Sequence, residues 1–387
     1  MKKFPDGFLF GAATSAFQVE GGIENNDWAE AARQGKVPPL GQASDHYRRF
    51  EEDFDIAKSL GHNAHRFSIE WARIEPEEGK FDQKEIEHYK AVVKALRARG
   101  IEPFVTLWHF SLPVWFARSG SFGRFDAPQI FARYAATVAK AFGDDVTFYL
   151  TMNEPEVWNG EHGREVHSAP GTGNPLLLLY FFGQLVNAHR AAYRAVRAVQ
   201  PKARIGVAKH QFSFVGRGFF GRLWATVCRY FWNRLFLNAL VGAQDFIGIQ
   251  YYQRWIFWQS EKEKKETKVS DFGWQLHPEG IYDVVKEATR YKLPIYITEN
   301  GIADAQDKDR AWYITETLRA LQRAIEEGAD VRGHFYWSLF DNYEFVQGYT
   351  MQFGLVSIDR DHDFARTVRP SAKVYSDIIR ANALPNS

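Results

Sequence analysis

Two glutamates stand directly after short apolar segments, Glu154 in TMNEP at 151–155 and Glu299 in ITENG at 297–301. If both segments are strands that end at one mouth, the two carboxyl groups can face each other across a bound molecule. Such a pair suits glycoside hydrolysis, in which one carboxyl group protonates the leaving oxygen and the other, ionised, attacks or stabilises the anomeric carbon. Burial and mutual repulsion would raise the pKa of the first group, and we expect Arg66 to be the cation that keeps the pKa of the second low. The distance between the two groups decides between retention and inversion of configuration, and residue spacing leaves both open.

Other polar and aromatic side chains gather at the ends of apolar segments. Sugars present hydroxyl groups that need fixed donors and acceptors, and apolar C–H faces that stack on aromatic rings. Candidates for binding the hydroxyl groups are Gln18, His109, Asn153 and Glu344, and candidates for the stacking surface are Trp108, Trp115, Trp274 and Trp337. Trp337 is favoured among the tryptophans because it lies a few residues before Glu344 at one strand end. Each of these residues taken alone is equally well explained as a helix cap, a loop side chain or a packing residue. These explanations do not account for the position of so many of them at the same end of the strands.

Eight short apolar, β-branched or aromatic segments recur along the chain, and helical patterns lie between them. The segments are 8–10, 64–69, 101–108, 146–152, 205–210, 246–252, 294–298 and 333–339. This alternation predicts an α/β protein in which eight parallel strands close into a single (β/α)₈ TIM barrel over residues 1–387, because closure leaves no unpaired edge. The catalytic site of such a barrel lies at the C-terminal ends of the strands. The alternative, an open doubly wound sheet that binds a nucleotide, is disfavoured because the first turn, GAATSAFQVEGG, lacks the G-x-G-x-x-G spacing.

Three helices are predicted from apolar residues that recur at spacings of three and four. The first follows Asp82, which can cap it, and stops at Gly100. The second runs from Asp126 to near Gly143, and the third, with apolar residues at positions 318, 321 and 325, ends before Gly328.

Composition excludes several classes of protein. The 48 basic and 47 acidic side chains leave a net charge of +1, which offers no field for nucleic acid, and 45% hydrophobic residues can form a sizeable core. A lone Cys228 excludes a disulfide framework, and no HExxH or paired-histidine spacing occurs, so we expect neither metal nor cofactor. The opening MKKFPDGFLF lacks the apolar stretch of a secretory signal, and no continuous apolar run reaches ~18 residues. We therefore expect a soluble, cytoplasmic protein without a membrane span.

The motifs of the chain resemble those of the family 1 glycoside hydrolases, the family of β-glucosidases and related retaining β-glycosidases, over nearly its whole length. They are FLFGAATSAFQVEGG at 8–22, RFSIEWARIEPEEGKFD at 66–82, TLWHFSLPVWF at 106–116, TMNEP at 151–155, DFIGIQYY at 245–252, DFGWQLHPEGIYD at 271–283, ITENG at 297–301 and GHFYWSLFDNYEF at 333–345. Each motif alone is moderately specific, but their order, with both glutamate motifs present, is very specific. The resemblance implies cofactor-free hydrolysis of terminal non-reducing β-D-glycosyl residues by double displacement, with small-molecule β-glycosides or oligosaccharides as substrates. β-Glucosidase activity would come first, with β-galactosidase or β-fucosidase side activity.

The resemblance also implies a role for each site residue. Glu154 would be the acid/base and Glu299 the nucleophile, while Asn153 would hold the sugar 2-hydroxyl. Arg66 and Tyr252 would lie against the nucleophile and keep it ionised. The residues that would bind the non-reducing sugar are Gln18, His109, Trp337, Glu344 and Phe345. A carboxylate at position 344 implies an unphosphorylated substrate, because a fixed anion repels phosphate.

Several positions depart from the family pattern. Phe345 and Phe110 stand where tryptophan is usual, Gln250 replaces an asparagine, and Met152 replaces a phenylalanine. The loss of an indole donor at Phe345 should weaken sugar binding. The chain is also short for the family, with trimmed stretches at 156–170 and 237–245, so we expect a mouth that is more open to water and to larger aglycones.

The segment 218–240, GFFGRLWATVCRYFWNRLFLNAL, is dense in aromatic residues. It is interpreted as a barrel helix with one face in the core. If its aromatic residues instead surround the helix, an exposed patch would mark a subunit contact, a partner or a membrane surface, and an oligomer is possible. Two alternatives to hydrolysis remain open: a transglycosidase that uses the same glycosyl-enzyme, and a carbohydrate-binding barrel with weakened catalysis.

Overall fold

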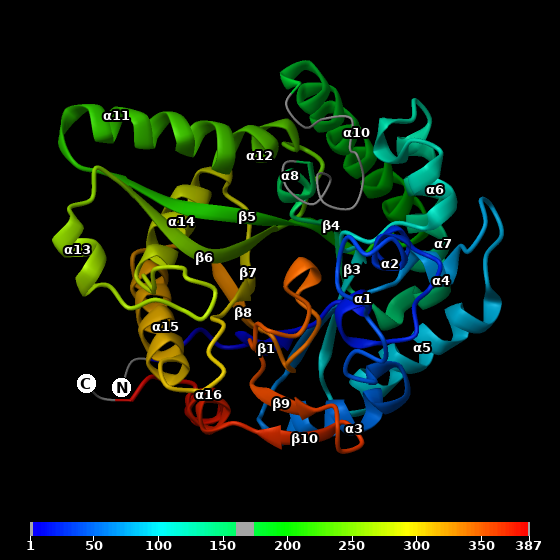
Figure 1. Ribbon diagram of the computed structural model, residues 1–387. Helices are drawn as coiled ribbons and strands as arrows, with labels where there is room; N and C mark the ends of the chain where they lie inside the picture. The colour runs from blue at the N-terminus through cyan, green and yellow to red at the C-terminus, as the bar shows by residue number, and fades with distance from the viewer. Residues whose placement is uncertain (1–2, 160–173, 386–387) are drawn as a thin grey trace.

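The computed structural model describes residues 3–159 and 174–385, and its centre is a closed barrel of eight parallel strands (Figure 1). In order, the strands are β1 Leu9–Ala13, β2 Ala64–Ser68, β3 Glu102–Trp108, β4 Phe148–Asn153, β5 Arg204–Gly216, β6 Ile247–Phe257, β7 Ile295–Asn300 and β8 Val331–Trp337. β8 pairs with β1, so the barrel has no open edge. The predicted (β/α)₈ barrel is confirmed, and each predicted apolar segment overlaps one of its strands.

Aromatic side chains fill the interior of the barrel. Phe104 stacks on Phe148 with ring centroids 4.2 Å apart and contacts Phe335 at 4.8 Å. Phe246 and Tyr296, with ring centroids 5.2 Å apart, complete the cluster. Most of these rings stand near the N-terminal ends of their strands. The barrel is therefore packed beneath the polar strand ends rather than forming a pore.

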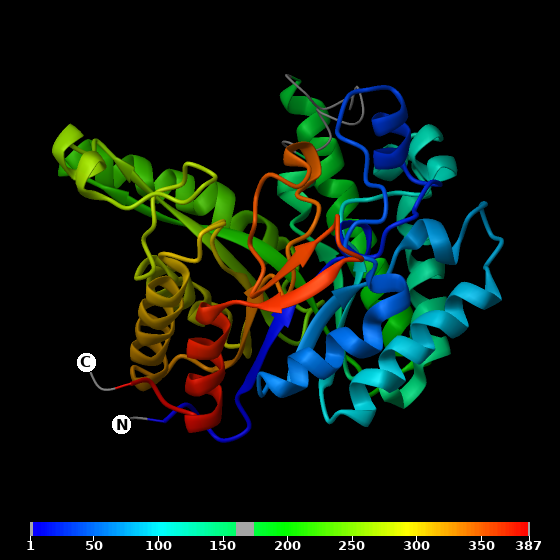
Figure 2. The same cartoon turned by 60° about the horizontal axis from the view of Figure 1, so that its bottom comes forward.

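Helices cover the outside of the barrel (Figures 1 and 2). The longer helices are α3 His46–Ser59, α5 Gln83–Ala98, α7 Ala127–Phe142, α10 Pro175–Val199, α11 Gly218–Cys228, α14 Gly280–Ala288, α15 Arg310–Glu326 and α16 Pro370–Ala381. The shorter helices are α1 Ala16–Val19, α2 Asp27–Arg33, α4 Trp71–Ile74, α6 Val114–Arg118, α8 Pro155–Val157, α12 Leu235–Ala239 and α13 Glu261–Glu266. The three predicted helices are confirmed as α5, α7 and α15. The Asp82 side chain accepts hydrogen bonds from the backbone N–H groups of Lys84 and Glu85, which explains where α5 begins.

A small antiparallel sheet follows the barrel and consists of β9 Val356–Asp359 and β10 Ala365–Val368. α16 comes next, and Lys3 pairs with Ala383, so the two ends of the described chain lie side by side (Figure 2). No helix in these described residues is long and apolar enough to cross a membrane. The assignment of all 387 residues to one domain stays a prediction.

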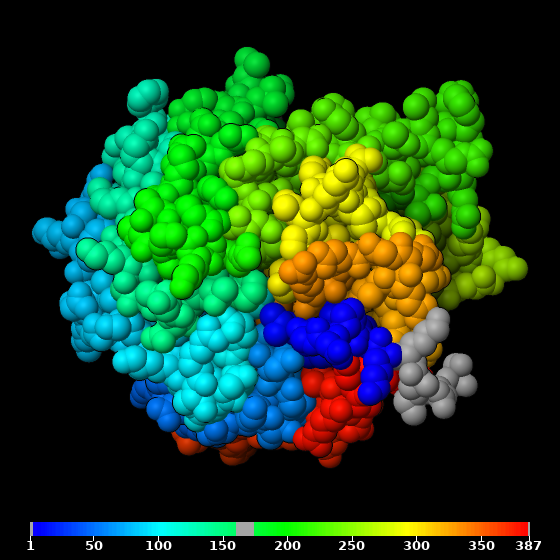
Figure 3. Space-filling view, turned by 180° about the vertical axis from the view of Figure 1, so that it is seen from behind, coloured from blue at the N-terminus to red at the C-terminus, as the bar shows by residue number. Residues whose placement is uncertain are grey.

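β5 and β6 continue beyond the barrel as a two-stranded ribbon. The predicted segments ended at 210 and 252, but the parallel pairing runs on to Gly216 and Phe257. α11 lies along this ribbon, and the two project together from the body of the molecule as an arm (Figures 1 and 3). The backbone of β5 at Gly216 packs against the backbone of α11 at Gly221. A Cβ on Gly216 would stand 2.0 Å from the carbonyl carbon of Gly221, so only glycine fits at position 216. The interpretation of 218–240 as a barrel helix with one face in the core is wrong for α11, since only the small residues Gly221 and Ala225 are buried and the large rings must face outward.

Candidate active site

A cavity of about 480 Å³ opens at the C-terminal ends of the barrel strands. Of the ten residues assigned to catalysis or sugar binding by sequence, nine line this cavity: Gln18, His109, Asn153, Glu154, Tyr252, Glu299, Trp337, Glu344 and Phe345. The tenth, Arg66, lies beneath the cavity floor and is fully buried. The volume and the mixture of rings with a few polar groups are typical of a site for a small molecule.

Glu299 stands near the end of β7, and two side chains from other strands donate hydrogen bonds to its carboxyl group. The guanidinium of Arg66 on β2 binds one oxygen, and the hydroxyl of Tyr252 on β6 donates to the other at 2.7 Å. Burial raises the pKa of this carboxyl group, while Arg66 and Tyr252 act in the opposite direction. Arg66 lowers the pKa of Glu299, in the predicted direction, but burial has the larger effect and the net shift is upward. A carboxyl group with only 4% of its residue exposed loses more hydration energy than the guanidinium restores.

Asn153, the last residue of β4, is held from two sides. Its side-chain oxygen accepts a hydrogen bond from Arg66 at 2.7 Å and another from the amide nitrogen of Gln250 at 2.9 Å. Gln250 also lowers the pKa of Glu299 through a side-chain hydrogen bond. Gln250, which stands where the family usually has asparagine, therefore contacts both Asn153 and Glu299. Because its oxygen is occupied, Asn153 offers its amide N–H groups to a ligand.

Glu154 follows β4 in a left-handed backbone conformation, with φ 41° and ψ 58°. Few residues with a side chain adopt this conformation, and backbone strain of this kind gathers at functional sites. Its backbone N–H donates to the carbonyl of Ala208 on β5 at 2.8 Å, and Pro155 then begins α8. These constraints turn the side chain into the cavity wall, where the residue is 8% exposed.

Three carboxyl groups influence the hydroxyl group of Tyr252 through their charge. Burial raises the pKa of Tyr252, and the negative charges of Glu299, Glu154 and Glu344 raise it further. Burial also raises the pKa of Glu344 to about 8, although the indole N–H of Trp337 donates to this carboxyl group at 3.1 Å. At neutral pH this raised pKa favours the protonated form of Glu344. The anion predicted at position 344 is thus opposed by burial, which removes the hydration that a carboxylate needs.

Gln18 and His109 complete the polar wall of the cavity. The Gln18 side chain accepts from the Ser15 hydroxyl at 2.6 Å and donates to Asn342 at 3.0 Å. The ring of His109 lies nearly parallel to that of Trp337, with centroids 5.8 Å apart and an angle of 18°. These contacts hold each side chain in one orientation, so a ligand meets a polar wall that is already ordered.

Two of the four predicted tryptophans, Trp274 and Trp337, line the cavity. The prediction is wrong for Trp108 and Trp115, whose indole N–H groups donate to backbone carbonyl oxygens at 3.1 Å and 2.8 Å away from it. Successive residues of a strand point to opposite sides. Trp108 faces the surrounding helices for this reason, while the next residue, His109, faces the cavity.

Sequence reasoning also missed an aromatic wall made of His210, Phe212, Trp232 and Trp255. The indole of Trp232 donates to His210 at 3.3 Å, and the Phe212 ring lies 5.3 Å from that of Trp232 and 5.8 Å from that of Trp255. Most of this wall stands on the parts of β5 and β6 near the arm. The alternation of rings at 210, 212 and 214 was the sequence signal for a longer β5.

The two positions where phenylalanine replaces the usual tryptophan are neighbours in the cavity. Phe345 has a φ of 48°, and its ring meets that of Phe110 edge to face with centroids 5.4 Å apart. On its other side the Phe345 ring lies 4.6 Å from the ring of Trp28. Neither phenylalanine side chain carries a polar atom, so this corner of the cavity is apolar.

The cavity offers carboxyl, amide, imidazole and aromatic groups. No lysine or arginine is among the described residues that line it. Within residues 3–159 and 174–385, no group of three His, Cys, Asp or Glu side chains lies close enough together to hold a metal ion. The arrangement suits an uncharged ligand with many hydroxyl groups and an apolar face.

A family model described as glycosyl hydrolase family 1 matches residues 1–215 and 237–384. Beta-glucosidase A of Thermotoga maritima is 31% identical over 99% of this chain and 99% of its own length. A beta-galactosidase of Sulfolobus acidocaldarius is 30% identical over 100% of this chain and 96% of its own length. The structure of a beta-glycosidase from Pyrococcus horikoshii superimposes with a TM-score of 0.90 and 34% identity, covering 99% of this chain and 96% of that one. The unmatched residues 216–236 contain α11.

Proposed function

Because this chain belongs to glycosyl hydrolase family 1, we propose that it is a retaining β-glycosidase that hydrolyses terminal non-reducing β-D-glycosyl residues by double displacement. The observation that carries the proposal is the position of Glu154 and Glu299 on the wall of one cavity, at the ends of β4 and β7. This chemistry needs a proton donor and an anionic nucleophile on opposite sides of one sugar, and the two carboxyl groups supply them.

In the first step, a carboxylate oxygen of Glu299 attacks the anomeric carbon and the bond to the leaving oxygen breaks. Glu154 gives its proton to that oxygen, and a covalent glycosyl-enzyme forms. In the second step, Glu154 takes a proton from a water molecule while the water oxygen attacks the same carbon and releases Glu299. Two inversions at one carbon give net retention of configuration.

The surrounding donors have separate tasks in this mechanism. Arg66 and Tyr252 bind different oxygens of Glu299, which orients the nucleophile and favours its ionised form. Asn153, held by Arg66 and Gln250, donates to the sugar 2-hydroxyl, a contact that strengthens in the transition state. The residues proposed to bind the other hydroxyl groups and the ring face are Gln18, His109, Trp337, Glu344 and Phe345.

The proposed substrates are uncharged small-molecule β-glycosides or oligosaccharides, with β-glucosides first and β-galactosides or β-fucosides after them. Relatives with both β-glucosidase and β-galactosidase names support this range. Glu344 can bond both the 4- and the 6-hydroxyl of a sugar. A 6-phosphorylated sugar is disfavoured, because none of the described lining residues is a cation that could neutralise the phosphate.

Removal of either carboxyl group tests the assignment. In Glu154→Ala the hydrolysis of nitrophenyl β-glucoside should fall about 10²–10⁴-fold, the usual contribution of a positioned acid or base. Glu299→Gly should cost more, since no other group can form the intermediate. Glu77→Ala, which changes an exposed glutamate, is the control. Circular dichroism and thermal unfolding check the fold, and undiminished activity in either site variant contradicts the proposal.

Proton NMR of the first product tests the stereochemistry. We expect the β-anomer of glucose to appear before mutarotation produces the α-anomer. If the α-anomer appears first, water attacks directly and Glu299 acts as a base. Tight sugar binding without turnover in the unmodified protein would instead support a carbohydrate-binding barrel.

A further inference from the structure

α11 turns its large apolar side chains away from the protein. Five residues define the α11 face. Phe219 (71% exposed), Phe220 (74%), Leu223 (54%) and Trp224 (51%) lie on α11, and Phe231 (62%) lies on the helical segment Arg229–Arg234 that follows it. The opposite side of the helix carries Gly221 and Ala225, which are buried against the ribbon. At the tip of the ribbon, the exposed ring of Trp258 adjoins Gly221. A contiguous apolar face in contact with water marks a surface that binds a partner or a lipid.

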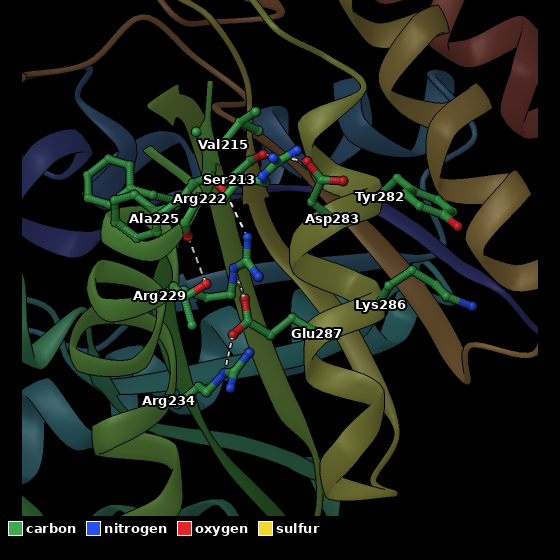
Figure 4. Close-up of a pocket in the computed structure, with 14 residues that line it drawn as sticks. Ser213, Val215, Arg222, Ala225, Arg229, Arg234, Tyr282, Asp283, Lys286 and Glu287 are labelled. Atoms are coloured by element: carbon green, nitrogen blue, oxygen red, sulfur yellow. Dashed lines mark hydrogen bonds and ion pairs between the residues drawn. The ribbon is translucent and has the colours of Figure 1, made fainter. Parts of the chain in front are cut away.

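Positive charge lies beside the α11 face. Residues 216–243 contain four arginines and neither Asp nor Glu. A groove of about 600 Å³ lies between α11 and α14. In Figure 4, Arg229 and Arg234 of this groove point toward Glu287. Arg222 lines the same groove together with Asp283 and Lys286 of α14, and no ion pair to Arg222 is found in the described part of the chain. Arg217, at the start of α11, pairs with Glu263. The segment therefore keeps a net positive charge after its ion pairs are counted.

We propose that the α11 face binds the surface of an anionic lipid bilayer. Phenylalanine, leucine and tryptophan are the side chains that enter the boundary between headgroups and acyl chains, and neighbouring arginines are attracted to lipid phosphates. The charge of the segment favours this occupant over a second copy of the chain. A two-fold contact through the α11 face would place two arginine-rich segments against each other, and like charges across an interface oppose binding.

The position of the arm is consistent with binding to a lipid bilayer. The arm projects from the body of the molecule (Figures 1 and 3), where a broad flat surface can reach it. Residues 216–236, which carry the α11 face, also fall outside the family match. Trp232, the neighbour of Phe231, lines the cavity. A bilayer on the α11 face would therefore lie beside the mouth of the cavity rather than behind the barrel.

Vesicle flotation with the full chain tests the proposal. The unmodified protein should float with vesicles of 70% phosphatidylcholine and 30% phosphatidylglycerol, more weakly with phosphatidylcholine alone, and less in high salt. Phe219→Ser/Phe220→Ser should lower binding to the anionic vesicles about tenfold or more. Arg222→Gln should lower it about fivefold and leave binding to phosphatidylcholine unchanged.

Phe125→Ser/Val199→Ser, which removes exposed apolar side chains elsewhere, is the matched control and should bind like the unmodified protein. Each variant is also assayed on a soluble aryl glycoside, which should be hydrolysed at the unmodified rate because these residues lie outside the cavity. Absence of flotation by the unmodified protein, or equal flotation of Phe219→Ser/Phe220→Ser, overturns the proposal. So does a dimer in sedimentation velocity that this double variant dissociates, because a second copy then covers the face.

Discussion

The carboxyl group of Glu299 is subject to two opposing influences. Burial favours its protonated form, while Arg66, Tyr252 and Gln250 favour the ionised form through charge and hydrogen bonds. The proposed nucleophile must be ionised in the free enzyme. The donors around Glu299 therefore decide how far into the acidic range the enzyme can work.

Tyr252→Phe tests this balance. Loss of the hydroxyl donor removes an influence that lowers the pKa of Glu299, so this pKa should rise and the acidic limb of the kcat/KM profile should move to higher pH. At a pH below the optimum, kcat/KM should fall about tenfold or more, the cost of one hydrogen bond to a charged group. Tyr282→Phe, in which a half-buried tyrosine outside the cavity loses its hydrogen bond to Glu327, is the matched control. An acidic limb that stays in place would contradict the role given to Tyr252.

The raised pKa of Glu344 leads to a second prediction at the scale of one residue. Below pH 8 the side chain is neutral and can both donate and accept, so Glu344→Gln at pH 6 should keep KM for nitrophenyl β-glucoside within about fivefold. Glu344→Ala, which removes these bonds, should raise KM more than tenfold. Above pH 8 the unmodified carboxyl group ionises, so KM of the unmodified enzyme should change with pH while KM of Glu344→Gln stays constant. A parallel pH dependence in both would refute the titration of Glu344 in this range.

At the scale of elements, strand ends could be predicted from the sequence better than side-chain directions. The apolar segments located all eight strands, and closure of the barrel then brought nine assigned residues to one cavity. Trp108 and Trp115 were misplaced because the side of a strand or short helix on which a ring lies depends on packing partners that are distant in sequence. The arm was missed for two reasons. β5 and β6 pair only with each other beyond the barrel, and α11 packs on them through glycine and alanine instead of large apolar residues.

Glu70, at the junction of β2 and α4, connects two segments of the chain that are distant in sequence. Its carboxyl group accepts hydrogen bonds from Ser111 at 2.8 Å and from Asn26 at 3.3 Å. Burial raises its pKa from 4.5 to about 7. Between these two values the folded protein holds a proton that the unfolded chain releases. The stabilising contribution of this proton is therefore complete below pH 4.5 and is lost as the pH rises through 7.

Glu70→Gln should remove this pH dependence. Relative to the variant, the free energy of unfolding of the unmodified protein should fall by about 3 kcal/mol between pH 4.5 and pH 8. Urea unfolding of both proteins at several pH values measures the difference, with Glu77→Gln as the exposed control. A difference between Glu70→Gln and the unmodified protein that is the same at both ends of this range would show that Glu70 does not titrate there.

At the scale of the whole molecule, the chain is compact for its family. Its 387 residues align with almost all of beta-glucosidase A from Thermotoga maritima over 444 positions, so the alignment leaves gaps in this chain. The stretch 237–245, predicted to be trimmed, lies where α12 ends at Ala239 and β6 begins at Ile247, and its shortening stays a prediction. The other predicted short stretch, 156–170, lies mostly outside the described residues. Shorter connections would leave the proposed catalytic residues in place and would give water and acceptors more access to the proposed glycosyl-enzyme.

The fate of the glycosyl-enzyme therefore separates hydrolysis from transfer. If the cavity mouth does not bind an acceptor, neither methanol nor water gains from positioning, and the two compete by concentration alone. With 1 M methanol in water at roughly 55 M, methanol should then capture about one glucosyl group in fifty. The ratio of free glucose to released nitrophenol measures this partition at several methanol concentrations. Capture more than tenfold above the concentration ratio would show that an acceptor is bound and oriented, and would make the protein a transglycosidase. In that case Trp255→Ala, which removes part of the aromatic wall, should return the partition to the concentration ratio, since a bound acceptor needs a surface on which to lie.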